Sequence, residues 1–245
     1  MAGIAWQVAT VAALKDETAH VKTLSLNVAG WSGHRPGQHV DIRLTAADGY
    51  QAQRSYSIAS APMSNGTLQL TIERVEGGEV SPFLHDEVVV GDRFEVRGPI
   101  GGYFVWDGTM TNPLVLVAGG SGIVPLMAIV RHRAATGSKV PCTLLYSSKT
   151  AADIIYGVEL ETLAVSGDGL RVVHTLTRAQ PTGWTGYNRR IDQTMLAEVL
   201  AGAGADPSVF ACGPTPLVEV AATALVALGL APSQVRTERF GPSGG

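Results

Sequence analysis

The first hundred residues alternate between apolar and polar positions in short runs. Alternation with a period of two, interrupted by turn residues, is typical of antiparallel strands that bury one face. The clearest segments are residues 4–11, 21–28, 39–44, 68–75 and 93–97. We also expect a short helix at Ser81–Asp86, because a serine that can cap a helix is followed by a proline. Short strands at this density predict a β-barrel or a β-sandwich.

The pattern changes after Asn112-Pro113. Leu114–Ala118 is apolar at every position, which is typical of a strand buried on both faces. Further strands are expected at residues 142–146, 170–176 and 208–212, and helices at 125–135, 155–163, 193–200 and 215–228. This alternation predicts a parallel sheet with crossover helices. We therefore expect two domains, residues 1–108 and 109–245.

Composition and charge exclude several classes of protein. The chain of 245 residues is 45% hydrophobic, which is enough for a buried core, and its net charge of −3 argues against a nucleic-acid binder. The longest apolar runs are far shorter than the roughly 20 residues of a membrane span, and no secretory signal is visible. Cys142 and Cys212 form no metal-binding or iron–sulfur pattern, and the histidines show no HxxxH or HExxH pair. We expect a cytoplasmic protein without a bound metal.

Two motifs in the first half could bind a ligand. In the segment Arg54-Ser55-Tyr56-Ser57, an extended chain would place Arg54 and Tyr56 on one face and the serines on the other. The segment could hold an anion and a flat ring, or it could be an ordinary strand with a surface arginine. The second motif, residues 77–82, is a flexible turn that leads into a helix start, which is either an anion site or simply a capped helix.

Two more motifs follow strands of the second half. Gly119-Gly120-Ser121-Gly122 lies between a buried strand and a helix, and so belongs to the carboxyl edge of the sheet, where open parallel sheets bind ligands. Cys212-Gly213-Pro214 follows another strand and should lie at the same edge. Cys212 is then either a small buried residue or one that contacts the ligand.

The four motifs, in this order, resemble those of the ferredoxin–NADP reductase superfamily in its stand-alone form. The segment Arg54–Ser57 is similar to the family's flavin motif, and the turn at residues 119–125 to its nicotinamide motif. The Cys-Gly-Pro segment and the C-terminal Thr237–Phe240 also match, so the resemblance covers nearly the whole chain. It implies an antiparallel Greek-key β-barrel that binds FAD, followed by a Rossmann-like α/β domain that binds NAD(P)H.

The resemblance also implies roles for individual residues around the flavin. Arg54 would pair with the diphosphate, Tyr56 would stack on the isoalloxazine ring, and Ser57 would donate toward flavin N5. The remaining residues implied in flavin binding are Ser55, Thr71, Ile72, Glu73, Glu79, Val80, Ser81 and, at the C-terminal end, Phe240.

Around the nicotinamide, the resemblance implies contacts by Gly120, Ser121 and Gly213. Cys212 would lie near nicotinamide C4 and Glu238 near the flavin edge, so that Ser57, Cys212 and Glu238 form the predicted catalytic set. Lys149, Arg178 and Arg190 match positions that hold cations around the 2′-phosphate of NADP. They favour NADPH, with NADH possible; they could also be solvated loop charges.

The function implied is an FAD-dependent reductase that takes hydride from NAD(P)H and passes single electrons to a separate acceptor protein. A ferredoxin, an oxygenase or a molybdenum enzyme would suit that role, and the Cys-x4-Cys-x2-Cys pattern of a ferredoxin-type module is absent from the sequence. Two alternatives remain: a reductase that binds flavin only as a substrate, and an electron-transfer or regulatory subunit without turnover of its own.

Overall fold

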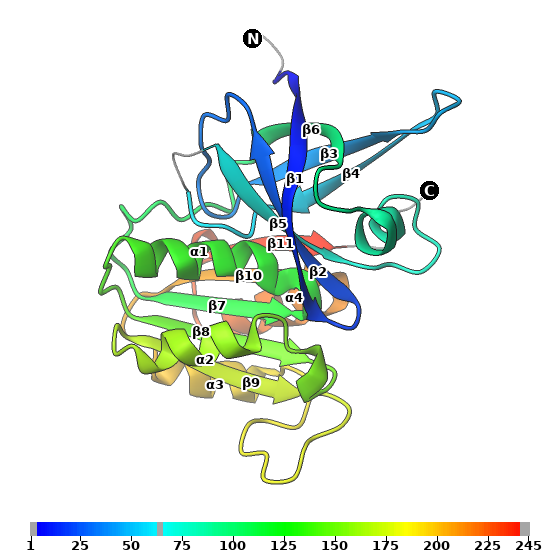
Figure 1. The fold of residues 1–245 in the computed structure, drawn as a ribbon. Helices are drawn as coiled ribbons and strands as arrows, with labels where there is room; N and C mark the ends of the chain where they lie inside the picture. The colour runs from blue at the N-terminus through cyan, green and yellow to red at the C-terminus, as the bar shows by residue number, and fades with distance from the viewer. Residues whose placement is uncertain (1–3, 63–65, 241–245) are drawn as a thin grey trace. The chain divides into compact units, whose positions relative to one another are not determined.

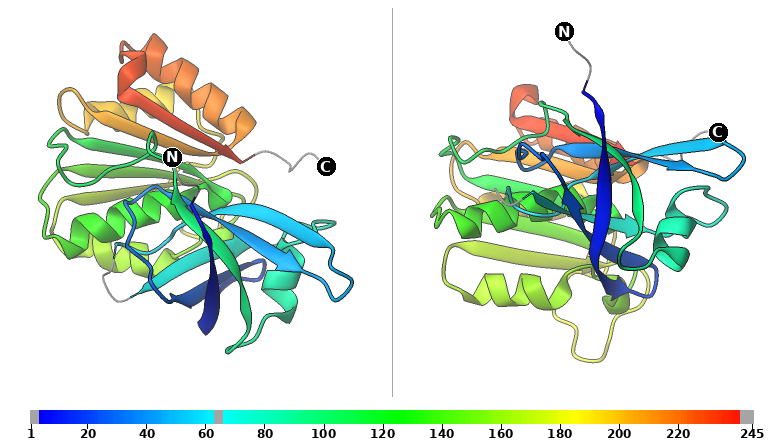
Figure 2. Two further views of the ribbon diagram at one scale, coloured as in Figure 1. Left: turned by 90° about the horizontal axis from the view of Figure 1, so that it is seen from above. Right: turned by 45° about the horizontal axis from the view of Figure 1, so that its top comes forward.

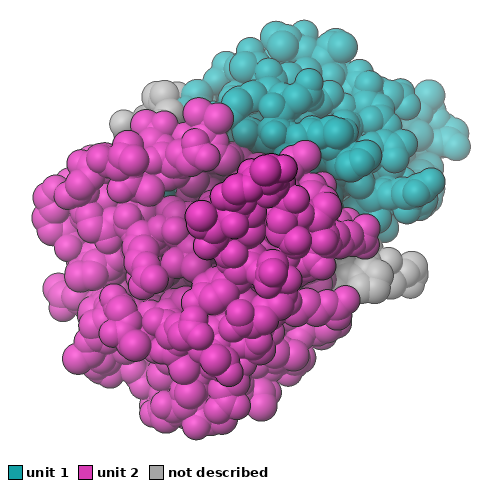
Figure 3. All heavy atoms as spheres, turned by 90° about the horizontal axis from the view of Figure 1, so that it is seen from below, with its two compact units in different colours: residues 1–107, 127–132 teal, residues 108–126, 133–245 magenta. Residues whose placement is uncertain are grey.

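The computed structural model describes residues 4–62 and 66–240. The chain divides into two compact units, residues 1–107 with 127–132 and residues 108–126 with 133–245 (Figure 3). The division at residue 107 is close to the domain boundary expected from sequence. Residues 127–132, which lie in a helix of the second half, group with the first unit.

The first unit is built on a six-stranded antiparallel sheet (Figure 1). Its strands are β1 (Trp6–Thr18), β2 (Val21–Val28), β3 (His39–Thr45), β4 (Gln51–Ser57), β5 (Thr67–Glu73) and β6 (Arg93–Ile100). They are ordered β4-β3-β6-β1-β2-β5, and an antiparallel bridge between Ile58 and Leu70 joins the two ends. This closure removes the exposed strand edges of an open sheet. The predicted antiparallel Greek-key barrel is therefore confirmed.

Apolar side chains from alternate strand positions fill the barrel. Leu24, Val40, Ile42 and Leu70 are fully buried, and Leu84 of the short helix η1 (Phe83–Glu87) joins the same core. Ser81 and Pro82 are also helical, so the short helix starts at Ser81 as the sequence predicts, and its π-helical part runs over Phe83–Glu87. The hairpin between β3 and β4 projects beyond the other strands of the unit (Figures 1 and 2).

The second unit contains a five-stranded parallel sheet of order β11-β10-β7-β8-β9. Its strands are β7 (Leu114–Gly119), β8 (Cys142–Ser148), β9 (Leu170–Leu176), β10 (Ser208–Pro214) and β11 (Val235–Phe240). Every residue of β7 and β8 is buried, as the apolar runs predict. The strand β11 is an addition to the elements expected from sequence.

Helices lie on both faces of this sheet (Figure 1). They are α1 (Ile123–Ala135), α2 (Gly157–Val165), α3 (Gln193–Ala201) and α4 (Thr215–Ala227), joined by the short turns η2 (Gly120–Gly122), η3 (Ala151–Asp153) and η4 (Pro232–Gln234). The helices α3 and α4 pack on one face, where Met195, Leu196 and Leu225 are fully buried. No helix in the described part of the chain is long and apolar enough to cross a membrane.

Candidate cofactor sites

The segment Arg54–Ser57 occupies the end of β4. Tyr56 packs against the barrel core and is partly exposed, and burial raises the pKa of its hydroxyl. Arg54 has the same strand parity, and its side chain is 35% exposed. The Ser55 hydroxyl lies on the opposite face, where it donates to Asp41 at 2.6 Å. An arginine and an aromatic ring therefore share one face of β4, as the alternation predicts.

Ser57 closes the strand in a buried position. Only 6% of the residue is exposed, and its hydroxyl forms no hydrogen bond with any residue in the described ranges. The hydroxyl oxygen itself stays accessible, since Ser57 Oγ is not one of the fully buried polar atoms that lack a partner among the described residues. Ser57 thus has an available donor, which fits the flavin contact implied by the family resemblance.

The glycine-rich segment at residues 77–82 folds into a tight loop. Its Ser81 hydroxyl accepts a hydrogen bond from the main-chain N–H of Val75 at 3.1 Å, and the N–H of Gly78 donates to the Val75 carbonyl at 3.0 Å. The N–H groups of Glu79 and Val80 donate to no residue that the structure describes. The contacts with Val75 fix the loop, and the N–H groups of Glu79 and Val80 remain available to bind an anion.

The two flavin-side motifs meet in space although about 20 residues separate them. Arg54 Nη2 lies 3.6 Å from Glu79 Oε2, which joins the end of β4 to the loop. A guanidinium and free main-chain N–H groups at one place form a site suited to a phosphate or diphosphate.

The third flavin-side segment, Thr71–Glu73, lies in β5 at the edge of the sheet order. The Thr71 hydroxyl is hydrogen-bonded to that of Thr23 at 2.7 Å, and Ile72 is fully buried in the core. Ile72 can therefore contact a cofactor only through its main chain, whereas the Thr71 hydroxyl already has one partner in β2.

In the second unit, the two glycine-containing turns lie against each other. A Cβ atom added to Gly122 would lie 2.1 Å from the main-chain oxygen of Cys212, and one added to Gly213 would lie 3.1 Å from the main chain of Gly119. Gly213 also has a φ of 155°. Glycine is therefore required at both positions by close main-chain approach. The turns meet at the carboxyl edge of the sheet, where the sequence predicts them.

A buried thiol and a buried carboxyl stand side by side at this edge. Cys212 of β10 pairs in register with Glu238 of β11. Cys212 is fully buried, and burial, followed by the nearby Glu238 charge, raises its pKa well above the usual value. Burial raises the pKa of Glu238 to about 7, and Glu238 Oε2 is buried with no hydrogen-bond partner within the described residues. The thiol is therefore neutral, and the carboxyl can change its protonation state near neutral pH.

Two further predicted residues of the nicotinamide side, Gly120 and Ser121, belong to the first of these turns and are partly exposed. Phe240, which the resemblance assigns to the flavin, ends β11 in register with Pro214 and is also partly exposed. The five residues that follow Phe240 in the sequence lie outside the described ranges.

The three predicted cations lie in loops that follow strands β8 and β9. Lys149 and Arg178 are brought together, since the main-chain N–H of Arg178 donates to the Lys149 carbonyl at 2.9 Å. Arg190 lies at the far end of the loop between β9 and α3. All three side chains are exposed, and within residues 4–62 and 66–240 none of them forms an ion pair. The neighbouring Arg189, by contrast, is paired with Asp192 at 2.7 Å.

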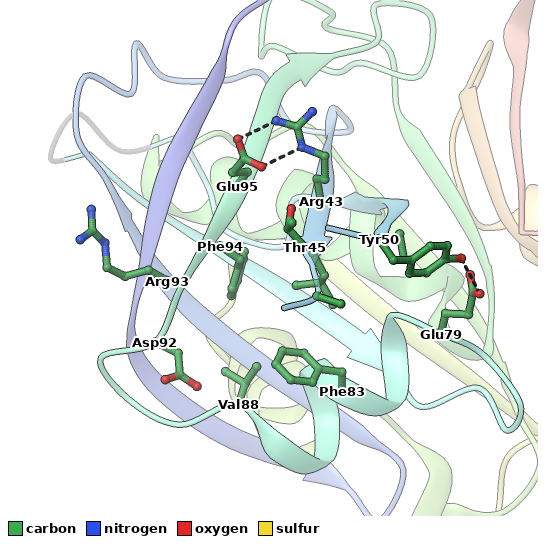
Figure 4. Close-up of a pocket in the computed structure, with 13 residues that line it drawn as sticks. Arg43, Thr45, Tyr50, Glu79, Phe83, Val88, Asp92, Arg93, Phe94 and Glu95 are labelled. Atoms are coloured by element: carbon green, nitrogen blue, oxygen red, sulfur yellow. Dashed lines mark hydrogen bonds and ion pairs between the residues drawn. The ribbon is translucent and has the colours of Figure 1, made fainter. Parts of the chain in front are cut away.

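The structure adds a cavity of about 570 Å³ in the first unit, and Glu79 is the one residue of the four sequence motifs among those that line it (Figure 4). Phe83, Val88 and Phe94 are among the residues that line it. At its rim Tyr50 and Glu79 point toward each other, and the Tyr50 hydroxyl donates to Glu79 Oε1 at 2.8 Å. The only sequence signal for this contact was that Tyr50 precedes β4 in a turn, which does not reveal its partner.

Comparison with known protein families supports the division of roles between the two halves. Residues 9–105 match the family described as oxidoreductase FAD-binding domain, and residues 116–223 match the oxidoreductase NAD-binding domain.

Individual proteins of known sequence or structure are also similar. The chain is 35% identical to ferredoxin–NADP reductase B of Sorangium cellulosum over 209 residues, which cover 83% of this chain and 84% of that protein. It is also 35% identical over 211 residues to the glycine betaine monooxygenase reductase subunit of Pseudomonas aeruginosa, covering 85% of this chain and 57% of the relative. The chain thus spans little more than half the length of that relative. A cytochrome P450 reductase from Amycolatopsis has the same fold, with a TM-score of 0.85, 27% identity and coverage of 98% of this chain and 71% of the other.

Proposed function

The chain belongs to the ferredoxin–NADP reductase superfamily, and we propose that it is an FAD-dependent NAD(P)H reductase that supplies single electrons to a separate redox protein. The observation that carries this proposal is the meeting of Arg54 with the loop at residues 78–81. Together they could hold an anion, and the partly exposed Tyr56 has the same strand parity as Arg54 on β4. Bound FAD would supply the chemistry, because a flavin accepts hydride from a nicotinamide and releases electrons one at a time.

The residues of the chain then have separable tasks. Arg54 and the main-chain N–H groups of Glu79 and Val80 would hold the diphosphate, and Tyr56 would support the flavin ring. The free hydroxyl of Ser57 would donate a hydrogen bond to flavin N5. Ile72, which is fully buried, would contribute only through its main chain, while the hydroxyls of Ser55 and Thr71 already have partners in Asp41 and Thr23.

On the nicotinamide side, we propose that the paired turns with Gly120, Ser121 and Gly213 receive the nucleotide. The neutral thiol of Cys212 would contact the nicotinamide ring, and Glu238 would hold or release a proton close to it. We assign the 2′-phosphate of NADPH to Lys149, Arg178 and Arg190, since cations without carboxylate partners suit a phosphate dianion.

Names of relatives guide the choice of acceptor. The similar proteins from Pseudomonas aeruginosa and Mycolicibacterium goodii are named as reductase components of a glycine betaine monooxygenase and a propane 2-monooxygenase. We propose that the acceptor of this chain is likewise a separate oxygenase or its electron-carrier protein.

Anaerobic stopped-flow reduction tests this function. The purified protein with bound FAD should lose flavin absorbance at 450 nm when it is mixed with NADPH, while the Ser57→Ala variant should keep FAD and be reduced more slowly. No reduction of the FAD-loaded protein by NADPH or NADH would contradict the proposed activity. An unchanged rate in the fully loaded variant would remove Ser57 from the mechanism.

A further inference from the structure

Arg54 is already partly neutralised by a carboxylate from the chain itself. Its Nη1 donates to the Gln53 carbonyl at 2.7 Å, and its Nη2 lies 3.6 Å from Glu79 Oε2. The two side chains are 35% and 52% exposed, so this is a partly solvated ion pair. The guanidinium proposed to bind a diphosphate therefore has an internal anion within reach.

Glu79 is held in this position by a second contact. Its other oxygen, Oε1, accepts the hydrogen bond of Tyr50 from the β3–β4 hairpin (Figure 4). The hydrogen bond is the main cause of a raised pKa at Tyr50. Glu79 thus bridges Tyr50 and Arg54, with one carboxylate oxygen on each.

We propose that Glu79 is an internal counter-ion that competes with the flavin diphosphate for Arg54 and thereby lowers the affinity for FAD. The inference rests on the proposed function, because it assumes that the diphosphate binds at Arg54. A guanidinium cannot give its best hydrogen bonds to the carboxylate and the diphosphate at once. In addition, Glu79 stays close to the diphosphate because its own main-chain N–H is one of the proposed donors, so two negative charges are brought together.

This arrangement has a consequence for the exchange of the cofactor. A site that carries its own anion remains close to neutral when it is empty. The free energy of the cofactor-free protein is therefore lower than it would be with an unpaired arginine. The cofactor would then be released more readily. With Glu79, the affinity for FAD would be intermediate between that of a reductase with permanently bound flavin and that of a reductase that exchanges its flavin.

Titration of the flavin-free protein with FAD, followed by flavin fluorescence, tests the proposal. Glu79→Gln keeps an acceptor for Tyr50 but removes the charge, and it should lower the Kd for FAD by about three- to tenfold, as expected for a partly exposed charge pair. Glu76→Gln is a matched control, because Glu76 is an exposed carboxylate of the same loop with no ion pair to Arg54. It should change the Kd by less than about twofold. Structural damage would weaken binding, so tighter binding separates the electrostatic role from a structural one.

Two further measurements identify the cause. The difference between Glu79→Gln and the unaltered protein should shrink as the salt concentration rises, because salt screens exposed charges. It should vanish when riboflavin replaces FAD, since riboflavin has no phosphate. An FAD affinity in Glu79→Gln that is unchanged or weaker, while the unaltered protein binds FAD, would overturn this inference alone. If neither protein binds FAD, the proposed function itself fails.

Discussion

The two proposed cofactor sites are built in different ways. The proposed flavin-side site joins side chains from separate elements to main-chain N–H groups of a loop, and the charged side chains of Arg54 and Glu79 remain partly exposed there. The nicotinamide-side site consists of main chain packed against main chain, with Gly122 so close to Cys212 that no side chain fits between them. The proposed flavin-side site thus depends on charged groups, and the proposed nicotinamide-side site depends on close packing of two main-chain segments.

The difference shows how each site should respond to substitution. Exposed charges in the first unit can be altered without disturbing the barrel core, so changes there should alter affinity more than folding. A buried main-chain contact in the second unit cannot adjust in this way, because protein interiors are closely packed. Substitutions at the turns should therefore affect the stability of that unit.

Gly122→Ala should produce the largest effect. The added Cβ would lie 2.1 Å from the Cys212 oxygen and would force β10 and η2 apart. We expect a loss of about 3 kcal/mol or more in the free energy of unfolding, at the upper end for overpacking. Urea denaturation followed by circular dichroism measures it.

Gly157→Ala provides the matched control for that substitution. Its added Cβ would meet only Ile154 at 3.5 Å, an ordinary contact distance. Stability within about 0.5 kcal/mol of the unaltered protein is expected there. Equal stability of the two variants would show that the turns are not closely packed and would break the contrast between the sites.

Glu238→Gln should have a pH-dependent effect of about 3 kcal/mol. The pKa of Glu238 is raised to about 7 from an ordinary value of 4.5, so the folded state favours the protonated form. The native protein consequently loses stability as the pH rises from about 4.5 to about 7. The gain from Glu238→Gln should be below about 1 kcal/mol at pH 5 and about 3 kcal/mol at pH 8.

Denaturant titrations of both proteins at the two pH values measure this gain. The direction in which the gain changes with pH is informative. If a cation stabilised the Glu238 carboxylate, the gain would fall as the pH rises. A gain that is independent of pH would mean that Glu238 is already ionised throughout the range.

Arg178→Ala and Arg190→Ala should have the smallest effect, because both side chains are exposed. Each should raise the KM for NADPH and leave that for NADH nearly unchanged, as NADH lacks the 2′-phosphate. The unaltered protein should favour NADPH at least about tenfold in kcat/KM, which corresponds to about 1.4 kcal/mol. Steady-state dye reduction with both nucleotides measures this preference. Equal losses of kcat/KM for NADPH and NADH in the variants would show that these arginines do not bind the 2′-phosphate.

Much of the architecture could be predicted from local pattern. Strand alternation indicated a barrel or a sandwich, and buried apolar runs placed the two glycine turns at one edge of a parallel sheet. The strand β11 was missed because Val235–Phe240 contains four polar residues and shows no apolar run. The segment forms a strand by pairing with β10, and this pairing cannot be recognised from the residues of the segment alone.

The candidate sites were predictable only as far as the motifs reached. Alternation correctly placed Arg54 and Tyr56 on one face of β4 and Ser55 on the other. The Tyr50–Glu79–Arg54 chain could not be predicted, because it depends on how a hairpin approaches a loop about 30 residues further along. The burial that raises the pKa of Glu238 is likewise a property of tertiary packing.

The most direct test of the account is the affinity of Arg54→Ala for FAD and for riboflavin, measured by titration of the flavin-free protein. We predict that FAD binding weakens about 10- to 100-fold, since a hydrogen bond to a charged group contributes about 1.5–3 kcal/mol. Riboflavin binding should stay unchanged, and so should FAD binding by the control Arg93→Ala, an exposed arginine of β6. An Arg54→Ala variant that binds FAD as tightly as the unaltered protein would contradict the assignment of the diphosphate to this site.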